Sequence, residues 1–157
     1  MSTAEAVAFV DHLRHGGKDV VLTNGVFDLL HPGHVRYLQA ARLEGDALIV
    51  AVNSDRSVRA IKGPLRPINS QAERAEVLAA LACVDAVVVF DEADPLQIVS
   101  RLQPDVLVKG ADWALEAIIG RDVVEARGGR VCRIPLAEGH STSAIIEKIR
   151  NAGDHLP

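Results

Sequence analysis

Short runs of Val, Ile, Leu and Ala alternate along the chain with longer stretches in which apolar residues recur every three or four positions. The short runs are continuous and bounded by turn residues, which is typical of strands buried on both faces. The longer stretches are typical of amphipathic helices. Strands are predicted over Asp19–Thr23, Ala47–Val52, Ala86–Phe90, Val106–Val108 and Arg130–Pro135. Helices are predicted over Val35–Gly45, Gln71–Ala82, Leu96–Leu102, most of 114–127 with an interruption near Gly120, and a last segment capped by Ser141 or Thr142.

Two regions lack a clear periodic pattern. Residues 55–69 are polar and contain Gly63, Pro64 and Pro67, which predicts a loop. About 18 residues at the start and the last few, from Ala152, are expected to decorate the sheet rather than to form its core.

Apolar strands separated by amphipathic helices predict an α/β fold, a doubly wound, Rossmann-like, five-stranded parallel sheet with helices on both faces. One domain over residues 1–157 is expected, with a core from about 20 to 150. Ligands of such folds bind beyond the carboxyl ends of the strands. Each polar cluster of the chain follows a predicted strand, so all of them should meet at one edge of the sheet. These clusters are Asn24–His34, Asn53–Asp55, Lys109–Asp112 and Gly139–Ser143.

Composition excludes several classes of protein. The net charge of −4 provides no general basic field for nucleic acid, and five aromatic residues are too few for a base-stacking platform. The longest apolar run, Val77–Val84, is far shorter than the roughly 20 residues that span a bilayer. Without a signal-peptide pattern we expect a cytoplasmic protein in which Cys83 and Cys132 are buried free thiols.

The segment Asn24–His34 carries the strongest chemical signal. Pro32 suits the first position of a helix, and Gly33 leaves the N–H groups of the first turn open to an anion. His31 and His34 lie at the same positive helix end, where two imidazoles can donate to a phosphoryl group. The structural alternative is a helix-capping His31 with a surface His34. Zinc is disfavoured, because only Asp28 is near as a further ligand.

This segment matches the pattern G-x-F-D-x-x-H-x-G-H at every fixed position and resembles the signature of the nucleotidylyltransferase superfamily. Gly139–Ser143 resembles the Ser/Thr-rich motif that opens the last helix there. The resemblance implies catalytic roles for His31, His34, Lys62 and Arg66. It implies nucleotide binding by Asn24, Gly25, Val26, Phe27, Gly33, His34, Lys109, Gly110, Asp112, Ser141, Thr142 and Ser143. Substrate contacts are expected from Asp28, Asn53, Asp55 and Arg74, with a turn role for Asp28 and a surface salt bridge for Arg74 left open.

Within the superfamily, the stretches TNGVFDLLHPGH, LIVAVNSD, KGPLRPI, VLVKGADW and EGHSTSAII resemble the heptose 1-phosphate adenylyltransferases of lipopolysaccharide core synthesis. An Arg-Thr pair typical of glycerol-3-phosphate cytidylyltransferases is replaced by Leu136-Ala137, which favours ATP over CTP. The resemblance implies transfer of AMP from ATP to D-glycero-β-D-manno-heptose 1-phosphate, by in-line attack without a covalent intermediate. It also implies Mg²⁺ held mainly by phosphates and water, a separate heptose kinase, and a homodimer.

Three alternatives remain: a glycerol-3-phosphate cytidylyltransferase, a phosphopantetheine adenylyltransferase, and a non-catalytic nucleotide-binding module. The glycine-rich motifs of nicotinamide enzymes and P-loop proteins are absent. Because Lys62 and Arg66 should repel each other across an empty site, residues 57–69 are expected to form a hinged flap that orders when triphosphate binds.

Overall fold

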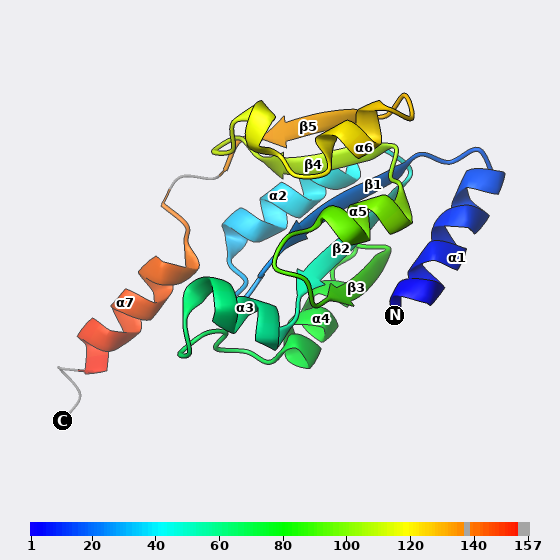
Figure 1. The fold of residues 1–157 in the computed structure, drawn as a ribbon. Coiled ribbons are helices and arrows are strands. Elements are labelled where there is room, and N and C mark those ends of the chain that lie inside the picture. Colours follow the sequence, from blue (N-terminus) through cyan, green and yellow to red (C-terminus); the bar gives the residue numbers. More distant parts are fainter. Residues whose placement is uncertain (137–138, 154–157) are drawn as a thin grey trace.

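Five parallel strands form the centre of the molecule (Figure 1). The computed structural model describes residues 1–136 and 139–153. The spatial order of the strands is β3-β2-β1-β4-β5, and every pairing is parallel. The predicted fold is therefore confirmed. The strands are β1 (Val20–Gly25), β2 (Ala47–Asn53), β3 (Ala86–Phe90), β4 (Val106–Gly110) and β5 (Arg130–Ile134).

Helices cover both faces of this sheet. Alternate side chains of one strand point to opposite faces, so Leu22 packs with α1, α5 and α6, whereas its neighbour Val21 packs with α2 and α4. α7 extends away from the sheet (Figure 1). The helices are α1 (Thr3–His15), α2 (Pro32–Arg42), α3 (Asp55–Lys62), α4 (Gln71–Ala79), α5 (Leu96–Leu102), the 3₁₀ turn η1 (Leu115–Ala117), α6 (Arg121–Glu125) and α7 (Thr142–Gly153).

Two helices occupy regions where the sequence pattern predicts none. Residues 55–62 form α3, so the prediction of a loop over 55–69 is wrong for its first half. The Ser54 hydroxyl accepts a hydrogen bond from the Ser57 amide and caps this helix. The helix is short and most of its residues are polar, with only Ser57 and Val58 buried, so its composition resembles that of a loop. The first 15 residues contain α1, whose Val10 contributes to the main core.

Arg74 is a buried connector between α4 and the loops that follow β1 and β2. It is 2% exposed, and its guanidinium donates to the carbonyls of Asn69 (3.1 Å), Val26 (2.6 Å) and Asn53 (2.8 Å). It also pairs with the Asp55 carboxylate at 2.9 Å. Of the two roles left open for Arg74, the structure shows the salt bridge, but Arg74 is buried and not on the helix surface. The pair holds together the segments that shape the carboxyl edge of the sheet.

Replacing Arg74 by Met is expected to lower the free energy of unfolding by about 3–5 kcal/mol, because Asp55 and three carbonyl groups lose their buried donor. Arg56→Met is the control, since the Arg56 side chain is 76% exposed in its ion pair with Asp91 and should contribute at most about 1 kcal/mol. Urea unfolding followed by circular dichroism measures both values. Similar losses in the two variants would contradict the connecting role of Arg74.

Candidate active site

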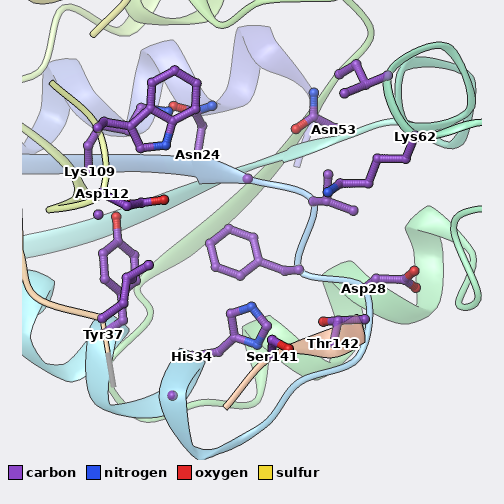
Figure 2. Close-up of a pocket in the computed structure, with 18 of the residues that line it drawn as sticks. Asn24, Asp28, His34, Tyr37, Asn53, Lys62, Lys109, Asp112, Ser141 and Thr142 are labelled. Carbon is purple, nitrogen blue, oxygen red and sulfur yellow. The ribbon is translucent and has the colours of Figure 1, made fainter. Parts of the chain in front are cut away.

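A cavity of about 640 Å³ opens at the carboxyl edge of the sheet (Figure 2). Strand ends supply Asn24 and Gly25 from β1, Asn53 from β2, and Lys109 from β4, and the N-terminal ends of α2 and α7 complete the wall. Members of all four predicted polar clusters line this one cavity, as parallel pairing requires. Asp55 and Arg74 do not line it, because they pair with each other behind the wall.

The two histidines of the motif lie face to face at the start of α2. His31 is the N-cap residue of a helix that begins at Pro32. The rings of His31 and His34 stack with their centroids 3.9 Å apart, and the His140 ring lies 6.1 Å from that of His31. A Cβ at Gly33 would lie 3.0 Å from the His31 ring and 3.1 Å from the His140 Cβ, so a larger residue here would have to displace these histidines. The motif thus builds a compact cluster of imidazoles beside the open N–H groups of a helix.

Both motif imidazoles favour the neutral form. Burial, reinforced by the neighbouring His31, lowers the pKa of His34 from 6.5 to about 4. The pKa of His31 is also lowered, first by burial and then by His140. Within residues 1–136 and 139–153, the Nδ1 atoms of both motif rings are buried without a hydrogen-bond partner. A neutral imidazole carries one N–H, so each ring presents one donor until an anion arrives and favours protonation.

The start of α7 lies beside the start of α2 at the cavity, with the His140 ring 6.1 Å from the His31 ring. Ser141 caps α7, since its hydroxyl accepts a hydrogen bond from the Ala144 amide at 3.1 Å. The Thr142 hydroxyl donates to the Leu29 carbonyl at 3.2 Å and ties this helix end to the loop after β1. Figure 2 places Ser141 and Thr142 beside His34. Ser143 also lines the cavity. Two helix N-termini therefore converge, and the Ser141 and Ser143 hydroxyls add donors at the start of α7, an arrangement that favours a multiply charged anion.

Cationic side chains approach the cavity from α3 and the segment after it. Lys62 is the last residue of α3 and is exposed, whereas Arg66 is partly buried; both line the cavity. The buried Asp28 carboxylate accepts hydrogen bonds from the Arg66 Nε at 2.7 Å and from the Ile68 and Asn69 amides at 2.9 Å. Burial acts to raise the pKa of Asp28, but these donors outweigh it and lower the pKa. The turn role left open for Asp28 is the one its contacts support.

Lys109 and Trp113 form the opposite side of the cavity. Lys109 is 9% exposed at the end of β4, and its Nζ lies 5.6 Å from the centre of the Trp113 ring. Burial lowers the pKa of Lys109 to about 8, although Asp112 opposes the change. Figure 2 shows Asn24 and Asp112 on this same side, with Asn53 and Lys62 across the cavity from them.

Several lining residues were not predicted as site residues. His140 and Trp113 stand inside the motifs EGHSTSAII and VLVKGADW, in which neighbouring residues were predicted to bind nucleotide. The others come from apolar positions or from a loop that has no motif, and only the fold brings them to the cavity. These residues are Tyr37, Ile61, Ala93, Asp94, Pro95, Ile119 and Leu136. Ala137, which enters the argument for ATP over CTP, lies outside the described residues.

In the part of the chain that the structure describes, no group of three or more His, Cys, Asp or Glu side chains is arranged to hold a metal ion. Cys83 and Cys132 are free, but both are half-buried rather than buried. No helix within the described ranges has the length and apolar character needed to cross a membrane.

Fold and site together define a nucleotidyltransferase. The chain belongs to the cytidylyltransferase-like family, which it matches over residues 22–148. It is 57% identical over 136 residues to the bifunctional protein HldE of Syntrophotalea carbinolica, covering 87% of this chain and 28% of the relative. It is 59% identical over 133 residues to the HldE protein of Citrifermentans bemidjiense, and this match covers 85% of this chain and 27% of that relative. The chain therefore spans less than a third of the length of these relatives.

Solved structures give a consistent result. The lipopolysaccharide core biosynthesis protein of Thermoplasma volcanium is 29% identical with a TM-score of 0.66, and the match covers 78% of this chain and all of that one. A protein of unknown function from Archaeoglobus fulgidus, at 23% identity and a TM-score of 0.59, shares the fold; the match covers 78% of this chain and 93% of that one.

His34 should make the stability of the free protein depend on pH. The unfolded side chain binds a proton near pH 6.5 and the folded one only near pH 4, so the free energy of unfolding should fall as pH decreases between these values. Because His34 is only partly buried, we expect the free energy of unfolding of the wild type to fall between pH 7 and 4.5 by about 1–2 kcal/mol more than that of a His34→Gln variant. Urea unfolding at pH 7 and 4.5 measures the difference, and an NMR titration of the imidazole locates its pKa. A His34 pKa near 6.5 would contradict this account.

Proposed function

We propose that this chain transfers AMP from ATP to a sugar 1-phosphate, namely D-glycero-β-D-manno-heptose 1-phosphate, and releases pyrophosphate and ADP-heptose. The convergence of the α2 and α7 N-termini on one anion-binding cavity carries this proposal. Support for the acceptor comes from the resemblance of five sequence stretches to heptose 1-phosphate adenylyltransferases. The HldE relatives and the structural neighbour from lipopolysaccharide core biosynthesis agree with that choice.

The proposed reaction needs no protein nucleophile. An oxygen of the sugar phosphate attacks the α-phosphorus of ATP, a new P–O bond forms, and the bond to the β-phosphate breaks in line with the attack. Catalysis then depends on holding the reactants in line and on neutralising the charge that develops on the phosphates. Neither cysteine lines the cavity, so neither is placed to form a covalent intermediate.

Roles for the cavity residues follow from their positions. His34 donates to the α-phosphate and binds it more strongly as negative charge grows, while His31 binds a neighbouring phosphate. Ser141 and Thr142, at the start of α7, receive the leaving pyrophosphate. Lys62 holds phosphate oxygens from the α3 side. Mg²⁺ would arrive with the triphosphate and take most of its ligands from phosphate and water. Of the carboxylates that line the cavity, Asp28 is already bound to three donors, whereas Asp94 and Asp112 could add a ligand.

We place the nucleoside against the side of the cavity formed by Lys109 and Trp113. An aromatic ring beside a buried cation offers a stacking surface and a hydrogen-bond donor for a base or ribose. Asn24, Gly110 and Asp112 complete this side. The acceptor then enters from the side of Asn53 and Lys62, across the α-phosphate from the leaving group.

The wider context is proposed on the resemblance alone. A kinase that phosphorylates the anomeric hydroxyl of the heptose must supply the acceptor, and a separate kinase chain, a cytoplasmic location and a homodimer remain our expectations. The alternatives within the family are a cytidylyltransferase for glycerol 3-phosphate and an adenylyltransferase for phosphopantetheine.

His34→Ala is expected to lower kcat about 10²–10³-fold while the Kd for ATP changes little, because the lost interaction strengthens mainly in the transition state. Pyrophosphate release measures turnover, and calorimetry with ATP and Mg²⁺ but no acceptor measures binding. His12→Ala is the control, since this exposed histidine lies on α1. Near-normal turnover of the His34 variant would remove the residue from the mechanism.

Among nucleotides, ATP should be used better than CTP, and among acceptors, heptose 1-phosphate should be used better than glycerol 3-phosphate or phosphopantetheine. The measurement is pyrophosphate release from every pair of nucleotide and acceptor. Preference for CTP with glycerol 3-phosphate would assign the chain to the cytidylyltransferase alternative. Binding of ATP without pyrophosphate release from any pair would contradict the proposed acceptor.

A further inference from the structure

We propose that Asp28 is a positioning residue for triphosphate binding: it holds one edge of the Arg66 guanidinium so that the other edge faces the cavity. This inference rests on the proposed function only in requiring that a polyphosphate occupies the cavity. It replaces the expected substrate contact of Asp28 with an indirect role exerted through Arg66.

The contacts of Asp28 fix both the arginine and the backbone that carries it. The carboxylate is 3% exposed, and it accepts hydrogen bonds from Arg66 Nε and from the amides of Ile68 and Asn69. The Asn69 side-chain amide donates in turn to the Asp28 backbone carbonyl at 3.1 Å. Residues 66–69 are thus bound to the loop after β1 at four points. Arg66 is therefore held in place relative to the segment Asn24–His34.

A guanidinium suits this arrangement because it has more than one hydrogen-bonding edge. Arginine carries five N–H donors in a rigid plane, and the Asp28 contact uses the Nε–H. Across the described segments 1–136 and 139–153, the terminal nitrogens of Arg66 make no protein hydrogen bond, and Arg66 lines the cavity. These nitrogens are available to bind phosphate oxygens in the bidentate geometry that arginine favours.

The Asp28–Arg66 ion pair also changes the expectation that repulsion between Lys62 and Arg66 makes residues 57–69 a flap. Asp28 neutralises Arg66 in the free protein, so Lys62 faces an ion pair rather than a second uncompensated cation. The stretch after α3 differs along its length: Leu65 is 80% exposed, whereas the Ile68 and Asn69 amides are bonded to Asp28. Any ordering by triphosphate should therefore be confined to the stretch near Gly63–Leu65, and residues 66–69 should be held beforehand.

The test is a double-mutant cycle on the binding of tripolyphosphate with Mg²⁺, measured by calorimetry without base or acceptor. Arg66→Gln should weaken binding about 10–100-fold, as expected for the loss of charge-assisted hydrogen bonds. Asp28→Asn keeps the shape of the side chain but removes the charge, and it should also weaken binding. If Asp28 acts through Arg66, the double variant should bind within about twofold of Arg66→Gln alone.

Asp55→Asn is the matched control. Asp55 is another carboxylate paired with an arginine in the same group of loops, but it does not line the cavity or contact Arg66. In the double variant with Arg66→Gln, the fold-change in the Kd for tripolyphosphate should equal the product of the two single-variant fold-changes. If the fold-changes of Asp28→Asn and Arg66→Gln also multiply in their double variant, the proposal is overturned. Wild-type affinity in the Asp28→Asn variant would overturn it as well.

Arg66→Lys keeps the proposal testable if Asp28→Asn fails to fold. A lysine retains the charge but lacks a second donor edge, so this variant should bind tripolyphosphate about as weakly as Arg66→Gln. Wild-type affinity in Arg66→Lys would overturn the proposal. Because the probe contains neither base nor sugar, a wrong nucleotide or acceptor in the proposed function would leave this result intact, so the two failures can be told apart.

Discussion

Parallel pairing of β1 with both β2 and β4 is the constraint on which the candidate site depends. It brings the carboxyl ends of these strands to one edge, and the chain leaves that edge through Asn24 and Gly25, through Asn53, and through Lys109 and Gly110. The apolar strands need helices on both faces, and those helices begin or end at the same edge. The same strand pairing therefore positions both the core and the cavity, and a change that shifts β1 would disturb both.

Two of the arginines at or near the cavity are already paired with carboxylates before any ligand arrives. Arg66 is paired with Asp28, Arg74 is paired with Asp55, and burial keeps His31 and His34 neutral. A polyphosphate therefore meets oriented N–H and O–H groups rather than a dense cluster of like charges. Such an arrangement limits repulsion in the free protein and still allows the imidazoles to gain protons when negative charge approaches.

How far the sequence predicts the structure depends on whether a signal is local. Strand Ala86–Phe90 and helix Leu96–Leu102 have the predicted boundaries, because a continuous apolar run and an amphipathic turn are complete within a few residues. Helix α3 is only eight residues long and mostly polar, and Gly63 and Pro64 follow it, so the polar composition of 55–69 led to the prediction of a loop. The partners of Arg74 include carbonyls 21 and 48 residues away, so its burial has no local signature. The motif residues can be predicted because their signal lies within one short segment. Tyr37 and Ile119 carry no such signal, and only the fold brings them to the cavity.

A crystal structure with Mg²⁺ and an ATP analogue that cannot be cleaved between its α- and β-phosphates tests the central claim most directly. The account predicts the α-phosphate within hydrogen-bond distance of His34, the outer phosphates at Ser141 and Thr142, and the terminal nitrogens of Arg66 on phosphate oxygens. The base should lie on the side of Lys109 and Trp113. A triphosphate bound away from the start of α2 would contradict the account.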